Sequence, residues 1–129
     1  DNILYELLGD LDAKEVEKFY EKRAFDVFLN TSQKEGVPVS IMEAMRWGVP
    51  VIAPAVGGIP ELVEEGRTGI LNDTFTPAAY AEKIRALYAD KPLLAEMSAH
   101  CIQKKDRMMT LERYCDQLLA LYGDVVKKA

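Results

Sequence analysis

Hydrophobic and polar positions divide the chain into two parts with different periodicity. Over residues 1–73, short apolar runs typical of buried strands alternate with segments of helical spacing. The strands are predicted at residues 3–8, 24–29, 49–53 and 70–72, and the helices between them at residues 12–23, 40–47 and 60–65. About four strands alternating with helices indicate an α/β fold, with a Rossmann-like parallel sheet and right-handed crossovers.

Residues 74–129 show helical spacing only. Thr76 and Pro77 start one helix, Lys91 and Pro92 interrupt the pattern before a second, and Thr110 starts a third. Their apolar positions are Tyr80, Ala81, Ile84, Leu87 and Tyr88; then Leu94, Met97 and Cys101; then Leu111, Tyr114, Cys115, Leu118 and Tyr122. We expect this helical tail to pack on the sheet, so that residues 1–129 form a single domain with helices on both faces of the sheet.

The first predicted helix has a clear start. Asp12 can cap its amino end and Glu15 can reach back to Asp12, which together make a capping box. Val16, Phe19 and Tyr20 repeat at helical spacing and are expected to form its buried stripe.

Composition and charge are those of one globular domain and argue against some partners. The chain has 129 residues, of which 49% are hydrophobic and 29% charged, and a net charge of -5. This length supports one core but not two. The acidic balance argues against nucleic acid and against a broad surface for anionic membranes. No apolar run reaches the length of a transmembrane segment.

Cysteine and histidine usage is sparse. Cys101 and Cys115 both lie in helical patterns, so we expect reduced, buried thiols in a cytoplasmic protein. The only histidine, His100, lies in the helical tail, where a surface or packing role is expected. No cluster of Asp, His or Cys has the spacing of metal ligands, so no metal is expected.

Two carboxylates, Glu35 and Glu43, bracket the stretch with the strongest chemical signal. Glu35 lies in a loop with Gly36 and Pro38 that follows a predicted strand, and Glu43 lies in the first turn of a helix beginning near Ser40. In open α/β sheets, ligands bind at the loops that follow the carboxyl ends of strands. The free N–H groups at the start of such a helix favour a phosphate group.

The side-chain chemistry of this stretch suits a sugar better than a bare phosphate. A carboxylate accepts two hydrogen bonds side by side, which matches the paired hydroxyls of a ribose or a hexose. Two carboxylates would repel a diphosphate unless cations lie nearby, and the neighbourhood supplies only Lys34 and Arg46. Further positive charge must therefore come from elsewhere.

Structural alternatives exist for each of these residues. Ser40 and Glu43 have the spacing of a capping box, in which Glu43 would serve the helix and not a ligand. Glu35 could be a solvated loop residue. Gly57 and Gly58 would let the backbone approach a ligand closely, but a tight strand-to-helix turn requires glycine equally.

Several motifs in order resemble the second half of the C-terminal, donor-binding domain of glycosyltransferase family 4, a family of retaining enzymes with the GT-B fold. The resemblance covers roughly residues 8–89. The matching motifs are Asp26-Val27-Phe28-Leu29, Ser32 with Glu35-Gly36-Val37-Pro38-Val39-Ser40-Ile41-Met42-Glu43-Ala44-Met45, Gly48-Val49-Pro50-Val51-Ile52-Ala53, Gly57-Gly58-Ile59-Pro60-Glu61-Leu62-Val63, and Gly66 with Gly69.

The resemblance implies roles for the candidate residues. Glu35 and Glu43 match the two acids of the family's E-x7-E motif, so Glu35 would be the catalytic residue that meets the hydroxyls of the donor sugar, and Glu43 would hold the ribose. Backbone amides of the intervening loop would lie against the sugar and the diphosphate, and a second candidate contact is the double glycine. The donor-binding loop residues are Gly36, Val37, Pro38, Val39 and Ser40, and the double glycine is Gly57 and Gly58.

The family's reaction retains anomeric configuration, mostly without a metal or another cofactor, and is generally viewed as a front-face displacement. In that scheme the leaving diphosphate helps to deprotonate the acceptor, so no dedicated nucleophile is expected.

Two departures from the family pattern matter. Pro38 stands where many members have glycine, which removes one backbone donor and stiffens the loop. The Arg and Lys that usually clamp the diphosphate belong to the first half of the domain, which this sequence lacks, as it lacks the N-terminal acceptor domain. We therefore expect a piece of a longer enzyme that is inactive alone.

The sequence thus predicts part of a cytoplasmic, retaining glycosyltransferase for polysaccharide or related glycoconjugate assembly. Its donor would be a nucleoside-diphosphate sugar, and its acceptor a glycan or lipid-linked molecule bound by the N-terminal domain, with peripheral membrane association of the complete enzyme open. The alternative is a non-catalytic nucleotide-sugar-binding module or one subunit of a split transferase. A flavodoxin-like signalling domain would require an acidic pocket near its first strand, which the sequence does not show.

Overall fold

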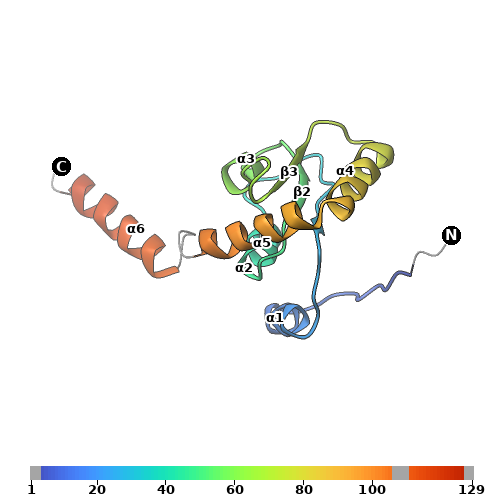
Figure 1. The fold of residues 1–129 in the computed structure, drawn as a ribbon. Helices are drawn as coiled ribbons and strands as arrows, with labels where there is room; N and C mark the ends of the chain where they lie inside the picture. The colour runs from blue at the N-terminus through green and yellow to red at the C-terminus, as the bar shows by residue number, and fades with distance from the viewer. Residues whose placement is uncertain (1–3, 106–110, 127–129) are drawn as a thin grey trace.

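The computed structural model describes residues 4–105 and 111–126 and has the predicted α/β architecture. Helices and strands alternate through the first part, and three helices follow (Figure 1). The elements in chain order are α1 (Ala13–Lys22), β1 (Phe28–Leu29), α2 (Val39–Arg46), β2 (Val51–Pro54), α3 (Ile59–Leu62), β3 (Gly69–Asn72), α4 (Pro77–Ala89), α5 (Lys91–Lys105) and α6 (Leu111–Val126).

The sheet of the described residues has three parallel strands in the order β1-β2-β3. Phe28 pairs with Val51 at one side of the central strand, and Val51 pairs with Gly69 at the other. Every residue of β2 is buried, as is typical of a central parallel strand covered on both faces. The strand order follows the chain order, so each crossover helix connects neighbouring strands.

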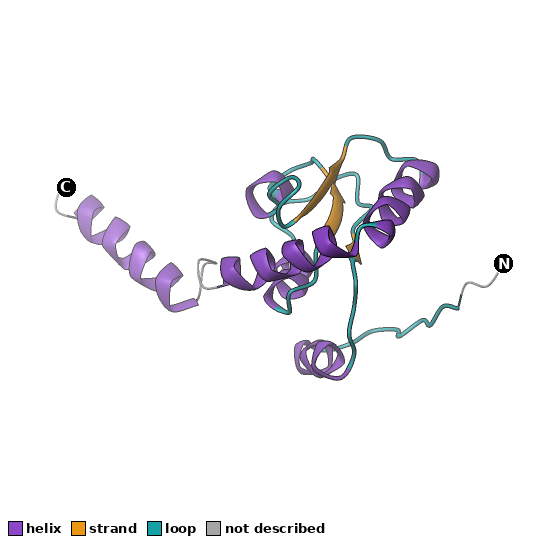
Figure 2. Cartoon of the chain, viewed as in Figure 1, coloured by secondary structure: helices purple, strands orange, loops and turns teal. Residues whose placement is uncertain are grey.

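Helices cover both faces of this sheet, as predicted (Figure 2). Successive side chains of β2 point to opposite faces, and they enter two different clusters. Val51 and Ala53 pack with the cluster that contains Ile41, Met45, Ile59, Val63 and Cys101 of α2, the α3 region and α5. Ile52 packs with the cluster that contains Tyr80, Leu87 and Met97 of α4 and α5. Helix α5 therefore contributes to both clusters.

The strand predicted at residues 3–8 is wrong for the described residues 4–8, which form no regular structure. Leu4 and Leu7 are 98% and 88% exposed. An apolar run becomes a strand only where a neighbouring strand supplies hydrogen-bond partners, and no strand of the described residues pairs with this segment. Residue 3 lies outside the described residues.

The other predicted strands are found with shorter or shifted bounds. The strand expected at residues 24–29 is reduced to Phe28–Leu29, because only this end reaches β2. The strand expected at residues 49–53 begins at Val51, since Pro50 has no N–H to donate, although its carbonyl accepts from Phe28 N at 2.8 Å. The helix expected at residues 60–65 is Ile59–Leu62.

The start of α1 is as predicted. Asp12 accepts hydrogen bonds from the backbone N–H groups of Lys14 and Glu15, and the Glu15 side chain accepts from Asp12 N at 2.8 Å, which completes the capping box. The stripe of α1 is half-buried and not buried. Its aromatic rings pack on the segment that leads into β1, where the ring centroids of Phe19 and Tyr20 lie 4.9 Å and 5.4 Å from that of Phe25.

The helical tail packs on the sheet only in part. Helices α4 and α5 contribute Tyr80, Leu87 and Met97 to the core, whereas α6 projects away from the sheet (Figure 1). Tyr114 and Tyr122 of α6 are 53% and 60% exposed. The predicted packing is therefore wrong for α6, because helical spacing of apolar residues reveals an apolar face but not what covers it. Thr110, the predicted start, lies outside the described residues.

The two cysteines are both free but differ in environment. Cys101 is buried, as predicted, and burial raises the pKa of its thiol to about 12. Cys115 is exposed on α6, so its predicted burial is wrong for the same reason as the packing of its helix. His100 is half-buried on α5, in line with a packing role.

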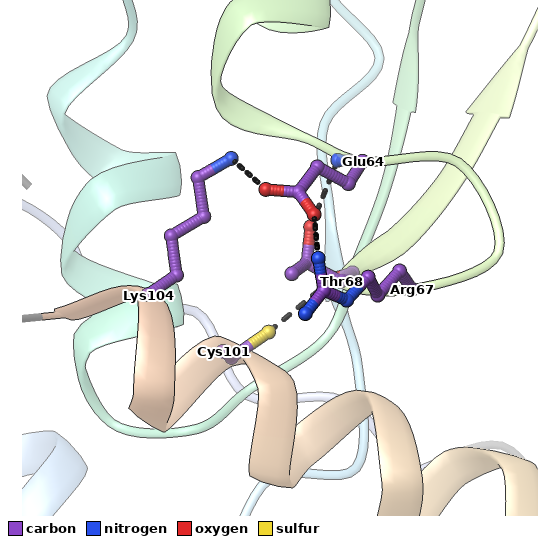
Figure 3. A network of polar contacts seen from close by, with 5 residues as sticks. All are labelled: Glu64, Arg67, Thr68, Cys101 and Lys104. Carbon is purple, nitrogen blue, oxygen red and sulfur yellow. Dashed lines mark hydrogen bonds and ion pairs between the residues drawn. The ribbon is translucent and has the colours of Figure 1, made fainter. Parts of the chain in front are cut away.

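A network of polar contacts fastens α5 to the turn that precedes β3 (Figure 3). Lys104 donates from Nζ to the Glu64 carboxylate at 2.8 Å, and Arg67 donates to the same carboxylate at 3.0 Å. Glu64 N donates to Thr68 Oγ1 at 2.9 Å, and the Cys101 thiol donates to the Thr68 carbonyl at 3.3 Å. The bond from Lys104 is the main cause that lowers the pKa of Glu64 below its ordinary value of 4.5.

In the described parts of the chain, no helix has the length and apolar character needed to cross a membrane.

We predict that Lys104→Gln lowers the free energy of unfolding near neutral pH by about 0.2–1 kcal/mol, the range of exposed ion pairs. Because the pair lowers the pKa of Glu64 in the folded state, its contribution is present above the ordinary value of 4.5 and is lost as the pH falls through the folded-state pKa. Urea denaturation at several pH values measures the difference in free energy of unfolding between the native chain and the variant.

The difference in free energy of unfolding between the native chain and Lys104→Gln should therefore disappear in acid. Lys105→Gln, an exposed lysine next along α5, is the control and should show no such dependence. A gap that stays constant from neutral to acidic pH would contradict the assignment of the effect to Glu64.

Candidate functional site

Two loops at the carboxyl ends of β1 and β2 lie in direct contact. Gly58 N donates to the Gly36 carbonyl at 2.6 Å. A Cβ on Gly57 would clash with the carbonyl oxygen of Glu35, and a Cβ on Gly58 would lie 2.6 Å from Cγ2 of Val37 and 2.7 Å from the Gly36 carbonyl oxygen. Gly57 also has a φ of +55°, which disfavours other residues. The double glycine is thus required by contact between the loops.

The Glu35 carboxylate is held from the end of β1. Asn30 Nδ2 donates to Glu35 Oε1 at 3.1 Å, and the Asn30 side chain is itself buried, with 8% exposure. Hydrogen bonds from Asn30 and then from Ser32 lower the pKa of Glu35, against a smaller effect of burial. Glu35 is half-buried and stays ionised at neutral pH. It is therefore a positioned carboxylate and not a freely solvated loop charge.

Helix α2 begins with its backbone donors available. Pro38 is the N-cap residue, with φ -72° and ψ 120°, and no side chain caps the first turn. Val39 and Ser40 are exposed at this end of the helix. The first N–H groups of a helix have no partner within it, so this end can receive an acceptor such as a phosphate oxygen.

The predicted alternative of a Ser40–Glu43 capping box is wrong. The N-cap position falls on Pro38, and Ser40 lies inside the helix. A capping side chain must belong to the non-helical residue that precedes the first turn, so Ser40 cannot take this role. Glu43 is half-buried in α2, and its carboxylate is not used as a helix cap.

Glu43 lies near α1. Burial, and then the charge of Glu43, raise the pKa of the Tyr20 hydroxyl. The phenol therefore stays protonated and keeps its capacity to donate a hydrogen bond.

The two cations noted in this stretch of the sequence, Lys34 and Arg46, lie at different places in the structure. Arg46 lies in the last turn of α2, at the opposite end from the exposed first turn. Lys34 is exposed in the loop that carries Glu35. The described residues therefore give this end of the sheet two carboxylates and little compensating charge. They also contain no group of three or more His, Cys, Asp and Glu residues placed to hold a metal ion.

The sequence-predicted residues thus fall into two groups. Direct contacts between the two loops join Glu35, Gly36 and Val37 to Gly57 and Gly58. Pro38, Val39, Ser40 and Glu43 follow on the start of α2.

Asn30, which holds Glu35, was not predicted as a site residue. Its signal was an asparagine at the end of a strand and two residues before Ser32, the spacing of a turn in which the side-chain oxygen accepts a backbone N–H. That bond is present, since Ser32 N donates to Asn30 Oδ1 at 2.8 Å.

Comparison with known proteins decides the family. The model of the family described as "Glycosyl transferases group 1" matches residues 5–108, which include both loops and both carboxylates. The chain belongs to this family. Its members are glycosyltransferases, and the GT-B fold predicted from the sequence is supported by the structural neighbours.

Comparison with individual proteins agrees with this family assignment. The chain is 35% identical over 104 residues to D-inositol 3-phosphate glycosyltransferase of Corynebacterium glutamicum, which covers 81% of this chain and 25% of that protein. Sucrose-phosphate synthase of Thermosynechococcus elongatus superposes with a TM-score of 0.82 at 25% identity, over 95% of this chain and 30% of that one.

A second solved structure contains a nucleotide. HepE of Anabaena, solved in complex with UDP, superposes with a TM-score of 0.71 at 26% identity, over 77% of this chain and 28% of that one. The same protein has been solved in complex with UDP-glucose. The chain spans about a quarter of the length of the curated relatives it matches.

We predict that Gly57→Ala lowers the free energy of unfolding by about 1–3 kcal/mol, the usual cost of overpacking, because the new methyl group meets the Glu35 carbonyl. Gly36→Ala is the matched control, since a Cβ at Gly36 meets nothing within 4 Å. Urea denaturation of both variants measures the difference. Equally small losses would mean that the two loops do not touch in solution.

Proposed function

We propose that the complete protein is a retaining glycosyltransferase of family 4 that transfers a glycosyl group from a nucleoside-diphosphate sugar. The observation that carries the proposal is the contact between the Glu35–Gly36 loop and the Gly57–Gly58 loop at the carboxyl ends of β1 and β2. This is where open α/β sheets bind ligands, and it lies within the region matched by the family.

Glu35 is proposed to meet the hydroxyls of the donor sugar. Its carboxylate is ionised and fixed by Asn30, so it can accept two hydrogen bonds from neighbouring hydroxyls without a large ordering cost. In this role Glu35 is the catalytic residue of the chain, since it would orient the anomeric carbon and stabilise positive charge that develops on the sugar ring in the transition state.

Glu43 is proposed to hold the ribose, and the start of α2 the diphosphate. Glu43 is not used by a helix cap, and the first turn of α2 has no side-chain cap, so both are available to a ligand. The loop from Gly36 to Ser40 would present its backbone to the transferred sugar. Pro38 contributes no N–H there and instead fixes the entry to the helix. Gly57 and Gly58 act on the donor through the loop that they hold.

The remaining parts of the reaction would come from outside this chain. The cations that neutralise the diphosphate and the domain that binds a glycan, lipid or other acceptor are proposed to belong to the rest of the protein, so this chain alone would be inactive. The leaving diphosphate would take the acceptor proton, in a front-face displacement without a metal. We place the enzyme in the cytoplasm, in polysaccharide or related glycoconjugate assembly.

The test is titration of the complete protein with a panel of nucleoside diphosphates and their sugars, beginning with UDP and UDP-glucose, followed by NMR of any product. Tight binding of one pair and a product with the donor's anomeric configuration would support the proposal. An inverted product would overturn the retaining mechanism, and binding without transfer to any acceptor would favour a non-catalytic binding module.

For Glu43, we predict that Glu43→Ala weakens binding of the nucleoside diphosphate by about 1.5–3 kcal/mol, the contribution of hydrogen bonds to a charged group. Isothermal titration of the complete protein measures this loss. Glu96→Ala, an exposed glutamate on α5, controls for the general loss of a negative charge. Unchanged affinity in Glu43→Ala would remove the ribose assignment.

For Glu35, we predict a different signature. Glu35→Ala should reduce kcat about tenfold or more while affinity for the bare nucleotide changes little, because the carboxylate is proposed to contact the sugar only. Steady-state kinetics and titration with UDP separate the two quantities. Equal losses in turnover and nucleotide affinity would mean that Glu35 supports the fold of the loop instead.

A further inference from the structure

Asn30 connects the end of β1 to the loop of the candidate site, and both the oxygen and the nitrogen of its side-chain amide are hydrogen-bonded. Its backbone N–H donates to the Ile52 carbonyl at 2.9 Å, which keeps it in register with β2. Its Oδ1 accepts from Ser32 N at 2.8 Å, and its Nδ2 donates to Glu35 Oε1 at 3.1 Å. The residue is 8% exposed, so few other partners can compete for these groups.

The two partners together fix which way the amide faces. Ser32 offers an N–H, which only the oxygen of the Asn30 amide can accept, and Glu35 offers an ionised oxygen, which only the nitrogen can satisfy. A flipped amide would lose both bonds. Asn30 is therefore locked in one orientation, with a donor aimed at the carboxylate.

We infer that Asn30 is a positioning residue for the donor sugar, which it serves by holding the Glu35 carboxylate in the orientation that meets the sugar hydroxyls. This inference rests on the proposed function, because it assigns Asn30 a role through Glu35. The arrangement requires an amide in particular. Serine is too short to span from the strand to the carboxylate, and aspartate keeps the turn to Ser32 but replaces the donor by a second negative charge.

Aspartate is therefore the informative substitution. Asn30→Asp preserves the size of the side chain and its acceptor for Ser32 N, but it loses the bond to Glu35 and adds repulsion between two carboxylates. Asn72 provides a matched control. It is a 3% exposed asparagine at the end of the neighbouring strand β3, and its Nδ2 donates to a backbone carbonyl, that of Thr74, at 2.7 Å.

The experiment measures affinities of the complete protein for UDP-glucose and for UDP. Asn30→Asp should lower affinity for UDP-glucose by about threefold to tenfold, the range of one lost hydrogen bond, and should leave affinity for UDP nearly unchanged. Asn72→Asp should not alter the ratio of the two affinities. A loss of affinity for UDP-glucose without a loss for UDP distinguishes loss of sugar positioning from general destabilisation.

The pH dependence supplies a second readout. As the pH is lowered, the introduced carboxyl group takes up a proton and can again donate to Glu35, so the loss in Asn30→Asp should shrink. The other charged side chains on this loop, α2 and α3 are Lys34, Glu43, Arg46 and Glu61. They are the same in the native protein and the variant, so they do not account for a difference between the two.

A double variant tests whether Asn30 acts through Glu35. In the double variant Asn30→Asp, Glu35→Gln, the glutamine amide can donate to the aspartate carboxylate. Its loss of stability to urea should therefore be smaller than the sum of the losses in the two single variants. The sugar-dependent affinity should nevertheless remain at the level of Glu35→Gln alone, since the carboxylate that meets the sugar is gone.

The outcomes separate two failures. If Glu35→Gln alters the ratio of affinities and Asn30→Asp does not, or alters it no more than Asn72→Asp, the positioning role of Asn30 is overturned and the proposed function stands. If Glu35→Gln leaves the ratio unchanged while the double variant still shows coupling in stability, the donor role of Glu35 is overturned, and the role of Asn30 falls with it.

Discussion

The backbone contact between the loops that follow β1 and β2 is the constraint on which the arrangement of the candidate site depends. One short hydrogen bond, from Gly58 N to the Gly36 carbonyl, joins two loops that belong to neighbouring strands. Such an approach is possible only where neither residue of the second loop carries a Cβ. The strands fix how far apart the two loops begin, and the glycines let the loops come into contact. The position of Glu35 therefore depends on the sheet.

The central strand supplies the rigidity behind this contact. Because β2 is buried on both faces, its side chains enter two separate clusters, and a shift of the strand would disturb both. Asn30 extends this rigidity beyond the sheet, since its backbone bonds to β2 and its side chain bonds to the loop. The carboxylate is thus connected to the core through one residue.

Much of the fold could be predicted from the sequence, because periodicity reports burial directly. The helix at Asp12 and the buried strand at Val51 were predictable for this reason, as was the order of elements. The strand at residues 3–8 could not be rejected from periodicity, since pairing requires a partner that a local pattern does not contain. The packing of α6 failed for a related reason: Tyr114 and Tyr122 define a face without identifying its neighbour.

Of the candidate site, the positions of Glu35 and the double glycine followed from motif order, and their roles toward a ligand remain predictions. The capping box at Ser40 was wrong because the exact first residue of a helix depends on Pro38, and a shift of two residues changes which side chain can cap. Asn30 was missed because its side chain makes two hydrogen bonds to residues nearby in sequence, and such bonds leave no periodic signal. Local polar contacts of this kind are therefore visible only in the folded structure.

The contrast between the two thiols has a practical consequence. Cys101 is enclosed in the core with a pKa of about 12, so the native protein shields it from alkylating reagents, which react with thiolates. Cys115 is exposed on the projecting helix. The native chain therefore offers a single attachment point for a fluorophore or a spin label, on the helix whose surroundings such a probe would report.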